Sequence, residues 1–133
     1  MTGHLAVRVY YEDTDAGGVV YYASYLKYLE RGRTEFLRTL GFEQRRLAEE
    51  DGLAFAVRSL SAEYLRPARL DDLLDIQTAI GELGRAQVTF AQSIRRGDET
   101  LFTATVRVAC LDLARGRPVA MPPPLHEKLK ALV

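Results

Sequence analysis

The chain has 133 residues, and its 18 basic and 18 acidic side chains give no formal net charge at pH 7. This length suits one domain with its own core, and the balanced charge argues against a broad nucleic-acid-binding surface. No apolar run approaches the length of a membrane span. The single cysteine, Cys110, rules out an internal disulfide and fits a reducing compartment. We expect one cytoplasmic domain over residues 1–133, with no membrane span and no nucleic-acid partner.

The first third of the chain predicts one strand and one long helix. Leu5–Tyr11 is rich in β-branched and aromatic residues, which favour a strand. Between Tyr22 and Leu40 apolar residues recur every three or four positions, which predicts a helix with one apolar face, and Gly41 supplies a stop. Gly32 lies in that face. Either a close approach of another group to the helix or simple tolerance explains a glycine there.

The remaining chain alternates with period two and predicts four antiparallel strands before a short terminal helix. Turn residues separate the strands, and Gly97-Asp98 is typical of a hairpin. The strands are expected at about Leu53–Leu65, Leu74–Ile80, Val88–Ile94 and Phe102–Cys110, and the helix at Leu125–Leu132. This order indicates the α+β class. We expect a curved antiparallel sheet of about five strands wrapped around one long helix, with Cys110 as an inert core thiol.

The connector between the first strand and the helix carries the strongest chemical signal. It holds the carboxylates Glu12, Asp13 and Asp15 and the pair Gly17-Gly18. Glycine lets another group approach the backbone closely, and the first N–H groups of a helix suit a developing negative charge. An ordinary acidic turn in which Asp15 caps the helix would contain the same residues. The spacing alone is consistent with both interpretations.

Two separated motifs resemble a known enzyme family. Residues 13–26 read D-T-D-A-G-G-V-V-Y-Y-A-S-Y-L, residues 28–37 read Y-L-E-R-G-R-T-E-F-L, and residues 63–74 read E-Y-L-R-P-A-R-L-D-D-L-L. From about Val7 to Leu111 the chain is similar to the hotdog-fold 4-hydroxybenzoyl-CoA thioesterase superfamily, in particular its Tol-Pal system-associated acyl-CoA thioesterases. The resemblance implies a single hotdog domain that hydrolyses a small or medium acyl-CoA to free acid and coenzyme A. It also implies a homo-oligomer, commonly a dimer of dimers, as expected where one helix leaves sheet edges uncovered.

The resemblance also implies roles for individual residues. Asp15 corresponds to the catalytic carboxylate, which attacks the thioester carbonyl or activates water, and Gly18 lies in the glycine pair beside it. The backbone N–H of Tyr22 corresponds to the donor that binds the oxyanion. Asp13 is expected to accept backbone hydrogen bonds and to structure the loop.

The chain departs from this family at Tyr22, where relatives commonly carry a histidine. Its own histidines, His4 and His126, lie outside the motifs and are expected at the surface. The change removes a candidate acid or base but keeps the backbone donor. A thiolate whose thiol has a pKa of about 8.5 also departs without prior protonation. The Tyr22 hydroxyl would bind substrate or Asp15, or its ring would only pack.

Arginines are candidates for binding the phosphates of coenzyme A, because the guanidinium suits bidentate contacts. Arg85, at an expected hairpin tip, corresponds to part of a basic cluster that contacts the nucleotide in related enzymes. Arg66 and Arg69 are further candidates, whereas Arg95 and Arg96 are interpreted as a solvated turn. No cysteine, histidine and carboxylate group has metal-ligand spacing, and no phosphate-binding glycine loop is present. We therefore expect no metal and no cofactor.

Two other functions remain open at this point. The protein would hydrolyse thioesters of acyl carrier protein, or it would bind acyl groups or envelope-associated partners without catalysis. A hotdog dehydratase is less well supported, because no histidine lies in a motif to serve as its base.

Overall fold

The computed structural model describes all residues from Met1 to Val133. Its antiparallel sheet has the strand order β1-β3-β4-β5-β2, and β6 pairs with β5. The strands are β1 (Gly3–Arg8), β2 (Leu53–Tyr64), β3 (Leu73–Leu83), β4 (Gln87–Arg96), β5 (Glu99–Asp112) and β6 (Arg117–Pro118). The helices are α1 (Ser24–Thr39), α2 (Gln44–Arg46) and α3 (Pro123–Lys130), with the short turns η1 (Tyr11–Asp13) and η2 (Leu47–Asp51).

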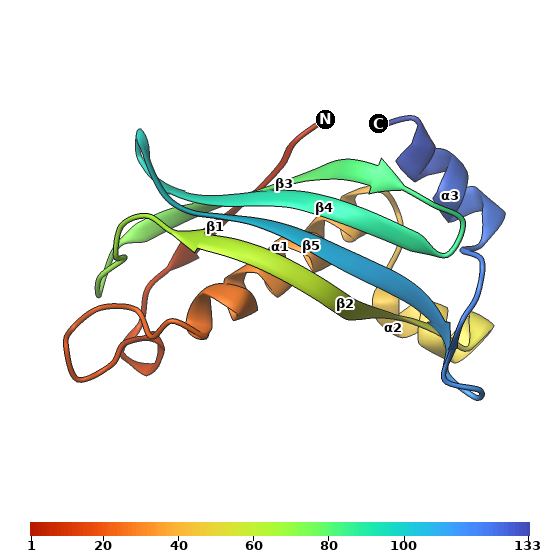
Figure 1. Cartoon of the computed structure of the whole chain (residues 1–133), viewed down its shortest axis with the longest axis horizontal. Coiled ribbons are helices and arrows are strands. Elements are labelled where there is room, and N and C mark those ends of the chain that lie inside the picture. Colours follow the sequence, from red (N-terminus) through yellow and green to blue (C-terminus); the bar gives the residue numbers. More distant parts are fainter.

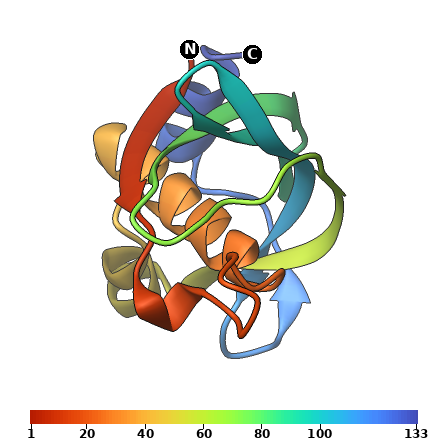
Figure 2. The same ribbon diagram turned by 90° about the vertical axis from the view of Figure 1, so that its left-hand side faces the viewer.

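The sheet curls around α1, which lies against its concave face (Figures 1 and 2). The predicted apolar face of the helix is buried from Tyr25 to Phe36. It packs against inward side chains of the central strands, among them Ile76 and Phe90, which are almost fully buried. This arrangement confirms the predicted α+β class and the hotdog architecture of one long helix wrapped by a curved antiparallel sheet. Cys110 lies in the same core, where burial raises the pKa of its thiol.

Several details of the secondary structure differ from the sequence predictions. β1 ends at Arg8, and Tyr11–Asp13 forms a turn of 3₁₀ helix instead of continuing the strand. The cause is local, because the Asp13 carboxylate accepts a hydrogen bond from the Tyr10 N–H (2.9 Å). α1 begins at Ser24, so Tyr22 precedes the helix instead of opening it. The two-residue strand β6 was not predicted.

β2 contains a bulge that changes the phase of its apolar residues. Its pairing with β5 shifts between Val57 and Ser59, which leaves Arg58 as the extra residue. Apolar side chains therefore face the concave side before and after the bulge although their numbers change from odd to even. Val57, Leu60 and Tyr64, which we call the β2 strip, are 47%, 42% and 50% exposed because β2 is an edge strand that α1 does not cover.

The convex face of the sheet is not apolar. Strand alternation places small and polar side chains there, including Ser61, Ala79, Thr89, Ala91, Ser93, Thr105 and Arg107. Apart from Leu73 on β3, the large apolar side chains of the sheet that stay exposed are therefore those of the β2 strip, at the edge of the sheet.

Gly32 marks a close approach of α1 to the sheet. A Cβ atom at Gly32 would lie 2.8 Å from Cγ2 of Ile76 and 3.0 Å from Oγ1 of Thr78. In the space that glycine leaves, the buried Gln92 donates from Nε2 to the Leu29 carbonyl (3.0 Å) and to Thr78 Oγ1 (2.9 Å). Of the two explanations for a glycine here, the close approach is therefore the one that the structure supports.

We predict that Gly32→Ala destabilises the fold. The added methyl group would press on the β-branched side chain of Ile76, and such overpacking costs about 1–3 kcal/mol, more than the gain of about 1 kcal/mol in helix propensity. Urea unfolding would measure the change. Lys27→Ala, at an exposed position of the same helix, is the control and should change the free energy of unfolding by less than about 0.5 kcal/mol. An alanine variant as stable as the parent would contradict the close approach.

Candidate active site

Asp15 opens a tight turn before α1. Thr14 and Val20 form an isolated antiparallel bridge, and the Asp15 N–H donates to the Val19 carbonyl (2.9 Å). The Gly18 N–H closes the turn on the Asp15 carbonyl (3.1 Å). Gly18 has a φ of +80°, a conformation that favours glycine, and no neighbouring atom lies within 4 Å of where its Cβ would be. The backbone angle therefore explains this glycine.

The Asp15 carboxylate is exposed and accepts one hydrogen bond, from the Gly17 N–H to Oδ1 (2.8 Å). Its Oδ2 atom has no hydrogen-bond partner. The interpretation of Asp15 as a helix cap is wrong, because the capping position of α1 is Ala23 and no side chain caps the helix there. The turn thus orients the carboxylate through one oxygen and leaves the other free.

Tyr22 lies between this turn and α1. Its N–H donates to no acceptor in the protein, and neither does the N–H of Ala23. The Tyr22 carbonyl accepts a hydrogen bond from the Tyr64 hydroxyl (2.8 Å), which restrains the peptide. Tyr22 is 65% exposed, and its ring lies against the Tyr21 ring. Two free amides therefore lie at the positive end of the helix dipole.

Asp13 supports the loop from inside. It is 7% exposed, its carboxylate binds the Tyr10 N–H, and its carbonyl accepts the Tyr21 N–H (2.8 Å). It therefore accepts backbone hydrogen bonds, as expected from the sequence. Tyr28 packs beneath this loop, where burial and the nearby Asp13 charge raise the pKa of its hydroxyl.

The second sequence motif forms the wall beside the Asp15 turn. The Val20 N–H donates to the Ala68 carbonyl (2.8 Å), and the Ala68 N–H donates to the Tyr25 hydroxyl (3.0 Å). Val19 also forms an isolated bridge with Arg69. The two motifs that carry the family resemblance therefore lie side by side.

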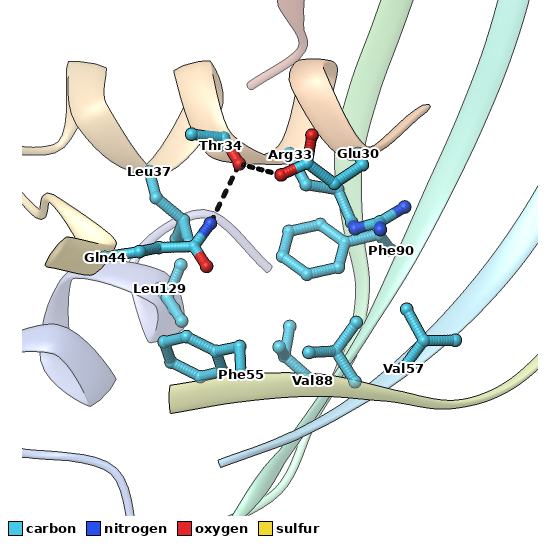
Figure 3. A pocket seen from close by; sticks show the side chains of 11 residues that line it. Glu30, Arg33, Thr34, Leu37, Gln44, Phe55, Val57, Val88, Phe90 and Leu129 are labelled. Carbon is cyan, nitrogen blue, oxygen red and sulfur yellow. Dashed lines mark hydrogen bonds between the residues drawn. The ribbon is translucent and has the colours of Figure 1, made fainter. Parts of the chain in front are cut away.

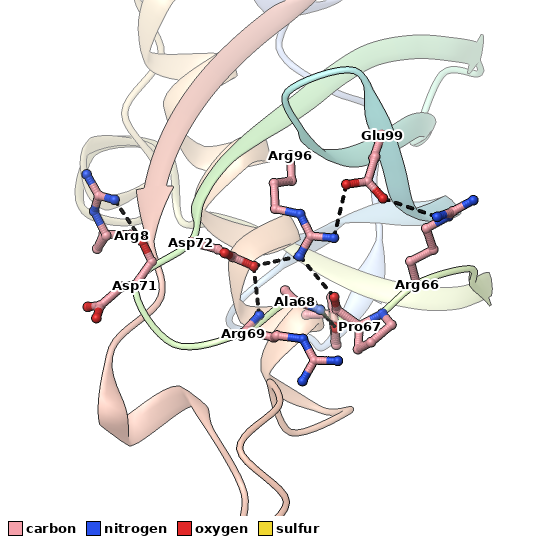
Figure 4. Close-up of polar contacts among 10 residues, drawn as sticks. Arg8, Arg66, Pro67, Ala68, Arg69, Asp71, Asp72, Arg96 and Glu99 are labelled. Carbon is pink, nitrogen blue, oxygen red and sulfur yellow. Dashed lines mark hydrogen bonds and ion pairs between the residues drawn. The ribbon is translucent and has the colours of Figure 1, made fainter.

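A polar network that the sequence analysis missed holds this wall in place (Figure 4). Arg96 Nη1 donates to Asp72 Oδ2 (2.7 Å) and to the Pro67 carbonyl (3.2 Å), while Nη2 donates to Glu99 (3.2 Å). Asp72 also accepts the Arg69 N–H (2.8 Å). Hydrogen bonding to Asp72, and secondly to Glu99, raises the pKa of Arg96. The interpretation of Arg96 as part of a solvated turn is therefore wrong.

The candidate arginines lie at opposite ends of the molecule. Arg66 and Arg69 are exposed beside the Asp15 turn, and Arg66 contacts Glu99 (3.3 Å). Arg85 is exposed in the β3–β4 hairpin at the other end (Figure 1). β3 alone has 11 residues, which corresponds to about 35 Å of strand. One chain thus brings Asp15, Gly18, Tyr22, Arg66 and Arg69 together but not Arg85.

A shallow hollow adjoins the free amide of Tyr22. Its lining is largely apolar and aromatic, and one end of the β2 strip contributes to it. The lining residues are Val20, Tyr22, Tyr25, Tyr64, Leu65, Arg66 and Pro67. No three histidine, cysteine or acidic side chains are grouped to hold a metal ion. None of the helices has the length and apolar character needed to cross a membrane.

The sequence and the fold both match known proteins. Residues 9–129 match the thioesterase-like superfamily. The chain is 54% identical over 116 residues to the acyl-CoA thioesterase YbgC of Haemophilus influenzae, covering 87% of this chain and 85% of that protein. It is 37% identical over 134 residues to YbgC of Helicobacter pylori, with coverages of 94% and 98%.

Solved structures give the same result. A probable thioesterase from Bartonella henselae superposes with a TM-score of 0.88 at 42% identity, covering 92% of this chain and 100% of the other. The protein TT1821 from Thermus thermophilus gives a TM-score of 0.92 at 27% identity, with coverages of 100% and 98%. The motifs, the curled sheet and these matches agree: the chain belongs to the thioesterase-like superfamily.

Proposed function

We propose that this protein hydrolyses acyl-CoA thioesters to a carboxylic acid and free coenzyme A at the Asp15 turn. The observation that carries the proposal is the pairing, at one end of the fold, of a carboxylate with a free oxygen and two unpaired amides. The apolar hollow beside them suits a small or medium acyl group. Two relatives that match most of this chain are named acyl-CoA thioesterases, which supports the same chemistry here.

In the proposed mechanism Asp15 either attacks the thioester carbonyl, which forms an acyl-Asp15 anhydride that water then hydrolyses to the free acid, or takes a proton from the attacking water. The carbonyl oxygen becomes negative and accepts a hydrogen bond from the Tyr22 N–H, where the positive end of α1 adds to the stabilisation. Space is open above Gly18, because a side chain's first atom there would meet nothing within 4 Å. The thiolate leaves without an acid, since its thiol has a pKa of about 8.5.

Release of free thiol from a panel of acyl-CoA substrates tests the activity and its acyl preference. The same acyl group carried by acyl carrier protein should turn over more slowly if coenzyme A is the natural carrier. If no thioester releases thiol, the non-catalytic acyl-binding function replaces the proposal.

We further propose that the protein acts as an oligomer, as a dimer of dimers. β2 pairs only with β5, so its outer edge presents unpaired backbone groups beside the exposed β2 strip. Because Arg85 lies far from the Asp15 turn of its own chain, it would contact the phosphates of coenzyme A bound at another copy.

For Arg85→Glu we expect a higher KM for acyl-CoA and a nearly unchanged kcat, because the contact lies far from the reacting carbonyl. The effect should shrink with added salt, since Arg85 is exposed. Steady-state kinetics measure this, and light scattering should show a multiple of the 14.9 kDa chain. An unchanged KM would indicate that Arg66 and Arg69 bind the phosphates instead. A monomeric protein would contradict the proposed contact between Arg85 and coenzyme A bound at another copy.

Substitutions at Tyr22 separate its backbone from its side chain. Tyr22→His and Tyr22→Phe keep the amide, so both should retain activity. Tyr22→Pro deletes the N–H, and loss of one oxyanion donor typically lowers kcat by roughly 10²–10³-fold. Circular dichroism would establish that the proline variant is folded. A folded and fully active proline variant would assign the oxyanion donor to another amide.

The decisive substitution is Asp15→Asn. Asparagine can still accept the hydrogen bond from Gly17, so the turn should form normally, but it is neither a carboxylate nucleophile nor an effective base. We expect kcat to fall at least about a hundredfold with little change in KM. The matched control is Asp13→Asn, which should keep far more turnover but lose about 1–3 kcal/mol of stability, because its buried carboxylate binds the backbone. An Asp15→Asn protein with near-normal turnover would contradict the mechanism.

A further inference from the structure

A side chain of β2 holds the peptide group that joins Tyr22 to Ala23. The Tyr64 hydroxyl donates to the oxygen of this group, the Tyr22 carbonyl (2.8 Å). The N–H of the same group belongs to Ala23, and it donates to no acceptor in the protein. A hydrogen bond to the oxygen of a peptide group polarises the group, which makes its N–H a better donor. The Ala23 N–H is therefore both free and polarised.

The preceding peptide group has the same arrangement. Its oxygen, the Tyr21 carbonyl, accepts the Ser24 N–H (2.8 Å), and its N–H, which belongs to Tyr22, is free. The bond from Ser24 closes a turn, in which Ala23 has helical angles (φ −76°, ψ −19°). Free N–H groups at the start of a helical turn point in about the same direction. Tyr22 and Ala23 thus present two donors on one side, where a single oxygen atom can accept both hydrogen bonds.

Aromatic packing orients the Tyr64 ring. The ring meets those of Tyr25 and Phe102 edge to face, with 5.3 Å and 4.9 Å between centroids. Tyr25 and Phe102 stack on each other (5.1 Å), and both are buried. Edge-to-face and stacked contacts are favourable arrangements of aromatic rings. The direction of the hydroxyl is therefore set before a substrate binds.

The bulge in β2 turns Tyr64 toward the helix. Before the bulge, odd-numbered side chains face the concave side, and Phe55 and Val57 line a cavity against α1 (Figure 3). After the extra residue, Arg58, even-numbered side chains do so, and Tyr64 pairs with Phe102. Without the bulge Tyr64 would face the convex side. The cavity in Figure 3 shares no lining residue with the hollow that Tyr64 lines, so the two halves of β2 serve separate sites.

The Tyr64 hydroxyl stays protonated well above neutral pH. Burial raises its pKa, and the neighbouring Tyr25 and Tyr22 raise that pKa further. Only the protonated phenol donates a hydrogen bond. The bond to the Tyr22 carbonyl is therefore present throughout the range of pH in which a thioester is stable.

We propose that Tyr64 is a positioning residue for the oxyanion: its hydroxyl holds and polarises the Tyr22–Ala23 peptide group, so that the Ala23 N–H acts as a second donor beside the Tyr22 N–H. The inference rests on the proposed thioesterase function. When the nucleophile attacks, the electron pair of the C=O π bond moves to oxygen, which accepts both hydrogen bonds. The pair returns when the C–S bond breaks and the thiolate leaves. Tyr64 gains and loses no proton in either step.

Tyr64→Phe removes the hydroxyl but keeps the ring that packs in the aromatic cluster and lines the hollow. We expect kcat to fall about tenfold, the equivalent of one hydrogen bond, while KM for acyl-CoA changes less than about twofold, because the oxyanion forms only after binding. Tyr10→Phe is the matched control, since it removes an exposed hydroxyl near the same turn, and it should change neither constant. An unchanged kcat in folded Tyr64→Phe, or a loss entirely in KM, would overturn the proposal.

Infrared spectroscopy tests the hydrogen bonds to the substrate without turnover. Hexanoyl-CoA labelled with ¹³C at the thioester carbonyl is bound to Asp15→Asn and to the double variant Asp15→Asn, Tyr64→Phe. Hydrogen-bond donors lower the stretching frequency of a carbonyl. We expect a lower frequency on Asp15→Asn than in free solution, and a partial return toward the free value in the double variant. A purely structural role of Tyr64 would leave the two frequencies equal, which would contradict the inference.

The ¹⁵N chemical shifts of the ligand-free protein test which amide Tyr64 controls. Tyr64→Phe should move the Ala23 resonance more than that of Tyr22, because the lost bond is to the carbonyl of the Ala23 peptide group. A larger change at Tyr22 would overturn the assignment to Ala23. If the wild type releases no thiol, the thioesterase proposal fails, whereas the infrared and ¹⁵N measurements still decide whether Tyr64 controls the Ala23 donor. If the wild type and Tyr64→Phe hydrolyse acyl-CoA equally fast, the thioesterase proposal stands and this inference fails.

Discussion

The close approach of α1 to the sheet at Gly32 is the contact on which both ends of the molecule depend. Because no side chain separates the helix from β3 and β4, the buried Gln92 reaches the carbonyl of Leu29 and fixes the helix along its axis. Toward the start of α1, this position presents the Tyr25 hydroxyl to Ala68. Toward the end, it allows Arg33 to donate a hydrogen bond to the side-chain oxygen of Gln92 (3.0 Å). A glycine that costs helix stability thus sets the register of the whole helix.

The Asp15 turn is shaped by its neighbours as much as by its own sequence. Local bonds close the turn, but Val20 and Ala68 attach it to the sheet, and Arg96 attaches the Ala68 segment to the β4–β5 hairpin. The carboxylate itself stays exposed. This division allows a reactive group to remain accessible while its supporting bonds lie in a partly buried network, where they are less screened by solvent.

Much of the fold could be predicted from local sequence pattern, and most of what the pattern missed depends on contacts between residues that are distant in sequence. The alternation of apolar and polar residues predicted the long strands, and the recurrence of apolar residues every three or four positions predicted α1. The two motifs identified the family and the side chains now found around Asp15. The role of Arg96, however, depends on Asp72, which is distant in sequence, and the bulge at Arg58 is a single inserted residue without a compositional signal. Sequence order also does not reveal that Arg85 lies at the opposite end from the Asp15 turn, or that Arg33 of α1 bonds to Gln92 of β4.

The pairing order of the strands has a consequence for synthesis of the chain. β1 pairs only with β3, and the Asp15 turn bonds to Ala68, so the earliest segment to leave the ribosome waits for partners made much later. α1 emerges with its apolar face uncovered, and its contact with Gln92 becomes available only after β4. Non-local pairing of this kind slows folding and exposes apolar surface meanwhile. The nascent chain should therefore acquire its site late, when the last central strand closes the sheet, and any fragment that stops before β5 would carry every residue of the Asp15 turn without the structure that orients them.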